Sequence, residues 1–169
     1  VKTGWEEARF GDVCELVKGR KPRLRAQPAK GDKPYLIAKV LRGESPAQYA
    51  SPDDRNAVSV EADETIIICD GSNSGETFCG FGGVLSSTMA KLRINRNDVD
   101  SRYLRLFLLM VVDDLKAGKV GAAIPHLDRD RLYAMRLPIP PLTEQRRIVA
   151  ILDEAFEGIA VAKANADRN

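Results

Sequence analysis

Residues 137–153 read LPIPPLTEQRRIVAILD, and here the chain changes from an extended segment into a helix. The three prolines cannot donate backbone hydrogen bonds and hold the residues before them extended, so no helix can run through them. Thr143 then occupies the position expected of an N-cap, and Glu144 places negative charge in the first helical turn. The pattern predicts a globular body that ends near Leu142 and a helix that leaves it from Thr143 onward.

The residues after Thr143 predict one long helix with an apolar seam. Apolar residues recur at alternating spacings of four and three, as in a heptad repeat; they are Ile148, Leu152, Ala155, Ile159 and Ala162. Such a seam packs against a second helix. An amphipathic helix docked on its own domain would show a similar pattern over so few heptads, and both interpretations stay open here. The chain therefore divides into a body, residues 1–142, and the start of a long coiled-coil spacer helix, residues 143–169.

Length and composition are those of one globular domain with an appended element. The chain has 169 residues, of which 44% are hydrophobic and 30% charged. Its longest apolar run is too short to span a membrane and its first residues lack a signal-peptide core, so we expect a cytoplasmic protein with no membrane partner. Three cysteines without a paired spacing predict reduced thiols, and a single histidine argues against a zinc site.

Positive charge is concentrated near the N-terminus. The segment from residue 16 to residue 43 holds nine basic residues and a single acid, Asp32, so it carries +8 in a chain whose net charge is +2. The nine are Lys18, Arg20, Lys21, Arg23, Arg25, Lys30, Lys33, Lys39 and Arg42. This asymmetry favours a local anionic partner, and nucleic acid is the first candidate. The alternative is a solvated, mobile basic loop.

The apolar patterns of the body indicate an α/β (α+β) fold. Residues 65–69 form a β-branched run that predicts a strand buried on both faces. Residues 35–41 and the alternating residues 89–94 also read as strands, with a glycine-rich strand region at 77–85. Asp100 or Ser101 can cap an amphipathic helix over residues 102–117. These elements predict a curved, mixed sheet with a few short helices, followed by the long C-terminal helix.

Three loops carry the candidate contact residues. Besides the basic loop, the DGSNSG sequence at 70–75 offers Ser72, Asn73 and Ser74, and the loop from Lys119 to His126 offers both of its end residues. DGSNSG is no phosphate-binding loop, because glutamate follows it where such a loop needs lysine. A tight turn is its alternative interpretation. His126 lacks a nucleophile motif, which favours a structural or contact role over catalysis. Gln145, Arg146 and Arg147 are further contact candidates in the first turn of the final helix.

The chain resembles the target recognition domain of the specificity subunit of Type I restriction-modification enzymes. Four pieces carry the resemblance in the same order, and together they extend over essentially the whole chain. They are Trp5 with Phe10–Val13 and Gly19–Pro22, then Asp70–Gly75, then Ala123–Leu127, then the junction Leu137–Ile148.

The resemblance implies a double-stranded-DNA-reading domain that is not itself a catalyst. It implies that the basic residues Lys18, Arg20, Lys21, Arg23, Arg25, Lys30, Lys39 and Lys119, with the two polar loops, face the duplex and read one half of a split target. The helix would pair with a second recognition domain or a second copy. Methyltransferase and restriction subunits would be partners and would hold S-adenosylmethionine, ATP and magnesium, with no cofactor on this chain.

Two rival functions remain from the residues alone. One is the recognition part of a DNA methyltransferase, which the sequence disfavours because no glycine-rich cofactor motif and no Asn-Pro-Pro-Tyr or Asp-Pro-Pro-Tyr motif occurs. The other is a protein-interaction or scaffold module built on the heptad helix, with the basic loop incidental to its function.

Overall fold

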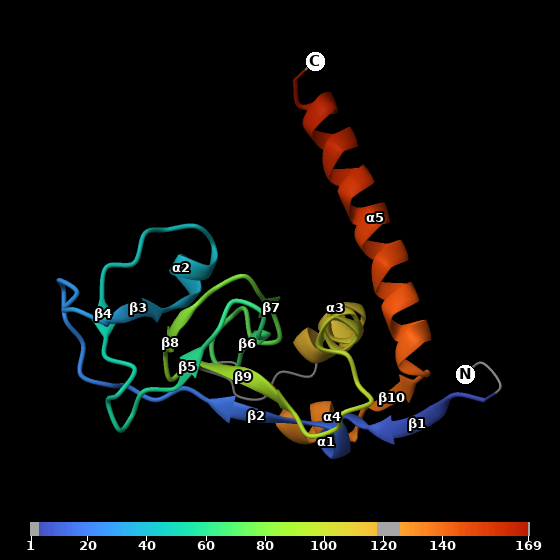
Figure 1. Cartoon of the computed structure of the whole chain (residues 1–169), viewed down its shortest axis with the longest axis horizontal. Coiled ribbons are helices and arrows are strands. Elements are labelled where there is room, and N and C mark those ends of the chain that lie inside the picture. Colours follow the sequence, from blue (N-terminus) through green and yellow to red (C-terminus); the bar gives the residue numbers. More distant parts are fainter. Residues whose placement is uncertain (1–3, 118–125, 169) are drawn as a thin grey trace.

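A computed structural model describes residues 4–117 and 126–168 (Figure 1). The elements in chain order are β1 Glu6–Arg9, α1 Phe10–Val13, β2 Cys14–Lys18, β3 Lys33–Leu36, α2 Ala38–Leu41, β4 Tyr49–Ala50, β5 Ser59–Val60, β6 Ile66–Ile68, β7 Thr77–Phe78, β8 Gly83–Leu85, β9 Met89–Ile94, α3 Ser101–Ala117, α4 Arg129–Ala134, β10 Arg136–Ile139 and α5 Leu142–Ala166. This is the mixed α+β class with a long terminal helix that the sequence predicts.

The strands form three sheets, and β6 lies inside the central one. The orders are β1-β10, β2-β9-β6-β7 and β4-β3-β8-β5, and β3 runs parallel to β8. Alternate residues of the β6 region enter different cores, because successive side chains of a strand point to opposite faces. Ile67 and Cys69 pack with α3, whereas Ile66 and Ile68 pack with β3 and β8. The prediction of a strand buried on both faces is confirmed.

The larger core lies between the sheet β2-β9-β6-β7 and α3. Leu104 and Leu108 of α3 are almost fully buried there, and Phe107 stacks on Phe10 of α1 with ring centroids 6.2 Å apart. Asp100 caps α3, since its Oδ1 accepts the backbone N–H of Arg102 at 2.9 Å. The predicted cap and the predicted span of this helix are therefore confirmed.

The strand predicted for residues 35–41 is wrong in its second half. The strand ends at Leu36 and the chain turns into the short helix α2. Strand β8, the parallel neighbour of β3, ends at Leu85 opposite Leu36, so no ladder partner continues beyond that pair. The helical turn instead places Val40 and Leu41 in the same core as Leu36. An apolar run of this length does not distinguish the two conformations in sequence.

Helix α5 begins one residue earlier than predicted, at Leu142, and the predicted N-cap at Thr143 is wrong. Pro141 is the N-cap residue, and its carbonyl oxygen accepts the N–H groups of Glu144 and Gln145 at 2.8 and 3.0 Å. Pro141 has an extended ψ of 147°, and its side chain has no hydrogen-bond acceptor, so the helix begins without a side-chain cap. Glu144 does lie in the first turn, where it binds Arg147 at 2.7 Å.

Only the base of α5 packs on the body. Figure 1 shows the helix rising away from the sheets, and every residue from 153 to 168 is exposed. Docking along its own domain is therefore excluded for this part of the helix. Ile148 is a correction to the predicted seam, because it is partly buried against the larger core instead of being free for a partner. Leu152 is half-buried, while Ala155, Ile159 and Ala162 are exposed.

Candidate nucleic-acid interface

Strand topology gathers two of the three predicted loops at one edge of a sheet. Both β2 and β6 run antiparallel to β9, so they run parallel to each other and their carboxyl ends lie at the same edge. Lys18 ends β2, and Asp70 follows β6. Lys18 Nζ lies 2.8 Å from Asp70 Oδ2. The basic segment and the DGSNSG loop therefore start side by side.

The third loop reaches the same edge through His126. An isolated antiparallel bridge pairs His126 with Asp70, and the N–H of Leu127 donates to the carbonyl of Cys69 at 2.8 Å. The His126 Nδ1 lies 2.8 Å from Asp70 Oδ1. All three segments that the sequence singles out thus meet around Asp70. The predicted contact at Lys119 lies outside the described residues.

The DGSNSG loop is a tight turn, which was its alternative interpretation. Gly71 and Gly75 have φ of +105° and +96°, the left-handed region that glycine adopts without strain. The Ser74 N–H donates to the carbonyl of Gly71 at 3.0 Å. Ser74 is fully buried, so the prediction that its side chain contacts a ligand is wrong for this structure. Ser72 is exposed and Asn73 half-buried, so both remain candidates.

Part of the predicted basic surface is neutralised by internal ion pairs. Arg25 binds both oxygens of Asp32 at 2.9 and 2.7 Å, and this hydrogen bonding, joined by the N–H of Ala29, lowers the pKa of the Asp32 carboxyl. Arg25 therefore braces the loop and is not a free cation. Lys39 lies on α2 and is 3.9 Å from Glu44, and it is not among the residues that line the groove described next.

A groove of about 380 Å³ runs along this edge beside the basic segment. Lys18 and Arg20 line one wall, and Arg55 and Asn56 line the other. Sequence reasoning missed Arg55 and Asn56 because they follow two aspartates in a polar, turn-rich stretch. Asp54 joins this stretch to the basic segment. Its Oδ2 accepts the N–H of Arg23 at 3.1 Å, and its Oδ1 accepts the N–H of Asn56 at 2.8 Å. These two backbone hydrogen bonds lower the pKa of the Asp54 carboxyl.

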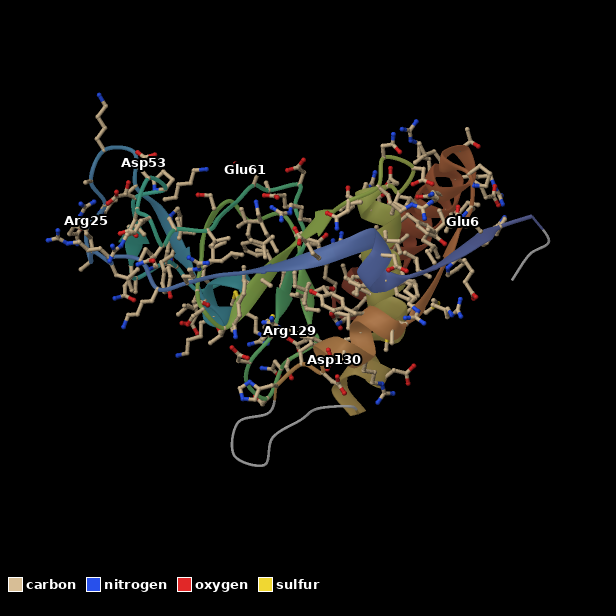
Figure 2. All side chains as sticks on the ribbon, turned by 90° about the horizontal axis from the view of Figure 1, so that it is seen from below. Glu6, Arg25, Asp53, Glu61, Arg129 and Asp130 are labelled. Carbon is tan, nitrogen blue, oxygen red and sulfur yellow. The ribbon has the colours of Figure 1, made fainter. Side chains whose placement is uncertain are left out.

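Exposed cations without an ion pair remain on this side of the molecule. Within residues 4–117 and 126–168, no carboxylate oxygen lies within 4.0 Å of a side-chain nitrogen of Arg20, Lys21, Arg23, Lys30 or Arg55. Figure 2 shows Arg25, which marks the basic segment, at the opposite end of the molecule from Glu6. Of these five unpaired cations, Arg20 and Arg55 line the groove, and an unpaired arginine is suited to binding phosphate through two N–H groups.

Gln145 is the predicted contact that the structure overturns most clearly. Its side chain is fully buried, and its amide donates to the carbonyls of Asp98 and Pro140 at 2.7 Å each. Its Oε1 accepts the N–H of Asp100 at 2.8 Å. Gln145 therefore joins the start of α5 to the start of α3. Arg146 and Arg147 are exposed.

The three cysteines are free thiols, and two of them are buried. Cys14 and Cys69 are buried and Cys79 is half-buried, all three as free thiols, and burial raises the pKa of Cys14 to about 12. Among the described residues, no group of three or more histidine, cysteine, aspartate or glutamate side chains is placed to hold a metal ion. Within those same residues, no helix is both long enough and apolar enough to cross a membrane.

A mixed α+β body with a cationic sheet edge and a projecting helix is the architecture expected of a nucleic-acid-binding domain. Comparison with known sequences assigns it more narrowly. Residues 2–166 match the family model described as the Type I restriction modification DNA specificity domain, and the chain belongs to that family.

Individual sequences and structures similar to this chain carry names of the same kind. The chain is 34% identical over 154 residues to the Type I restriction enzyme MjaVIII specificity subunit of Methanocaldococcus jannaschii, a match that spans 91% of this chain and 36% of that protein. The HsdS subunit from Thermoanaerobacter tengcongensis shares the fold, with a TM-score of 0.72 at 23% identity over 98% of this chain and 40% of its own. A chain from a structure of a type I R-M system gives a TM-score of 0.78 at 22% identity, and the match covers 98% of this chain and 41% of that one. The chain thus spans well under half the length of these relatives.

Proposed function

We propose that this chain binds double-stranded DNA in a sequence-specific manner and reads one half of a split target. The observation that carries the proposal is the meeting of the basic segment, the DGSNSG loop and His126 at one edge, beside a groove lined by Lys18, Arg20 and Arg55. Arg20 and Arg55, the groove cations that carry no ion pair among the described residues, would hold the phosphates, and polar side chains at the edge would contact bases.

The projecting helix is the second part of the proposal. Seam residues Ala155, Ile159 and Ala162 are exposed, and so are Ile151 and Phe156 beside them, at 51% each. Contiguous apolar surface of this kind marks an interface. A second recognition domain or a second copy of this chain would supply the partner helix, and the helix pair would set the distance between two half-sites.

Membership of the family supports proposals for the remaining roles. Under this proposal the chain performs no chemistry and works in the cytoplasm, where it positions a methyltransferase subunit and a restriction subunit. Those subunits would hold S-adenosylmethionine, ATP and magnesium. Labelled S-adenosylmethionine that bound to this chain alone would contradict this division of labour.

The salt dependence of DNA binding tests the interface. Each phosphate contact contributes about −0.9 to the slope of log K against log salt concentration. The triple variant Arg20→Ala, Arg23→Ala, Arg55→Ala should therefore reduce the slope by up to about 2.7 on a duplex selected by the wild-type chain. Lys163→Ala, on the exposed face of α5, is the matched control and should leave the slope unchanged.

An unchanged slope in the triple variant would remove Arg20, Arg23 and Arg55 from the interface. The exposed apolar residues of α5 favour one other function, a protein-interaction module. That function would be supported if Ile159→Asp abolished DNA binding while the triple variant bound DNA like the wild type.

A further inference from the structure

Asp70 uses its two carboxylate oxygens for two different partners. Oδ2 binds Lys18 Nζ and Oδ1 binds His126 Nδ1, each at 2.8 Å. The exposed fractions of the three side chains are 19% for Asp70, 39% for Lys18 and 52% for His126. The carboxylate therefore lies beneath the two groups that it holds, and those groups are the ones presented to solvent.

The backbone holds this cluster in place from both sides. The N–H groups of Cys69 and Asp70 both donate to the carbonyl of Thr88, at 2.8 and 3.1 Å. The N–H of Leu127 binds the carbonyl of Cys69, which fixes the residue after His126. The imidazole is thus attached to a sheet edge by main-chain and side-chain hydrogen bonds together, an arrangement suited to precise contacts.

The carboxylate determines which ring nitrogen of His126 faces outward as an acceptor. Burial raises the pKa of the Asp70 carboxyl, but hydrogen bonds and charges from Lys18 and His126 lower it by more, so its net direction is downward and Asp70 is ionised at neutral pH. An ionised carboxylate only accepts hydrogen bonds, so Nδ1 must carry a proton. In the neutral imidazole, Nε2 is then an acceptor.

We infer that Asp70 is a positioning residue that holds His126 as the Nδ1–H tautomer, so that Nε2 accepts a hydrogen bond from an exocyclic amino group of adenine or cytosine in the major groove. This inference rests on the proposed function, since it assumes that the edge meets DNA. The adenine N6 and cytosine N4 amino groups are the major-groove donors. The ammonium group of Lys18 neutralises the carboxylate, which would otherwise repel the phosphates of a bound duplex.

The tautomer can be measured without DNA on the 169-residue chain. His126 is its single histidine, so the ring ¹⁵N signals need no assignment. Long-range ¹H–¹⁵N spectra, recorded at a pH at which the ring is neutral, should show the proton on Nδ1. Asp70→Asn offers an amide that also donates, so that preference should be lost. A proton on Nε2 in the wild type would overturn the inference.

Selection from randomised DNA duplexes gives the functional readout. The wild-type chain should select a motif in which one adenine or cytosine position is relaxed by Asp70→Asn and by His126→Phe, with affinity for the wild-type motif about tenfold lower. His126→Gln can place an amide oxygen where Nε2 lies and should keep part of the preference. Lys163→Ala, on the exposed face of α5, should keep the whole motif.

The outcomes separate this inference from the proposed function. If the wild-type chain enriches no motif, the proposed function fails. If the wild type enriches a motif and His126→Phe enriches the same one at equal affinity, this inference fails while the proposed function stands. Because His126 is half exposed, a folding defect in this variant is not expected, and circular dichroism checks it.

Discussion

Replacing Gln145 by alanine removes the side chain that joins the base of α5 to the turn before α3. Three hydrogen bonds are lost, to the carbonyls of Asp98 and Pro140 and to the N–H of Asp100. All three partners are backbone groups next to a fully buried amide. Each such bond contributes about 0.5–1.5 kcal/mol, so we expect the free energy of unfolding to fall by about 2–4 kcal/mol.

Gln145→Glu makes the prediction sharper because it keeps the size of the side chain. One oxygen still accepts the N–H of Asp100, but the other faces the carbonyl oxygens of Asp98 and Pro140. Burial and these oxygens raise the pKa of the introduced carboxyl. Its folded pKa then lies above the unfolded value of about 4.3, so the loss of stability is greatest at neutral pH and shrinks as pH falls through the raised pKa.

Urea unfolding followed by far-UV circular dichroism measures both variants, with Thr143→Ala as the control. Thr143 is exposed in the same helical turn, and alanine has the higher helix propensity, so this variant should match or slightly exceed the wild type. Trp5 fluorescence reports on the base of α5, because Trp5 and Ile148 line one apolar pocket. If the free energy of unfolding of Gln145→Ala lay within about 0.5 kcal/mol of that of Thr143→Ala, the bracing role of Gln145 would be refuted.

Two further predictions concern packing. Gly19→Ala should destabilise the fold by more than about 2 kcal/mol in thermal or chemical unfolding, because the new Cβ would lie 2.1 Å from the carbonyl oxygen of Ser86. Gly158 of α5 has open space where a Cβ would lie, so Gly158→Ala should raise the free energy of unfolding by about 0.5–1 kcal/mol. Equal free energies of unfolding for the two variants would contradict the close approach described at Gly19. With a thiol-specific disulfide reagent, half-buried Cys79 should react first and the buried thiols only at the rate of unfolding. Modification of Cys14 as fast as Cys79 would show that the core opens locally.

The elements that could be predicted from sequence are those with a local physical cause. The run at 65–69 is apolar at every position after Thr65, and only burial on both faces satisfies it, as β6 shows. Helix α3 has a capping aspartate and one apolar face, so its start and its packing side were both readable. The segment 35–41 failed because its ladder partner ends at Leu85, which no local pattern records.

The sequence predicts the candidate site as three separate loops, whereas in the structure residues from all three lie at one edge of the sheet β2-β9-β6-β7. Sequence reasoning found Lys18 and His126 but not Asp70, the residue that binds both. It also missed Arg55, which joins the groove from a segment whose neighbours are acidic. It counted Arg25 as free, although Asp32 neutralises it. A charge count along the chain cannot separate cations paired in the fold from those left unpaired.

The sequence by itself determined the class of fold, the long terminal helix, the concentration of basic residues and the family resemblance. Periodicity, capping residues and local charge depend only on residues close together in the chain, so they can be read without knowing any tertiary contact. Only the tertiary structure decided that α5 stands free beyond its base, that Gln145 is a buried brace and that Asp70 joins two distant segments. Those outcomes depend on which strand ends share an edge and which surfaces meet, and a carboxylate or an amide acquires its role only from the groups that the fold brings within hydrogen-bond distance.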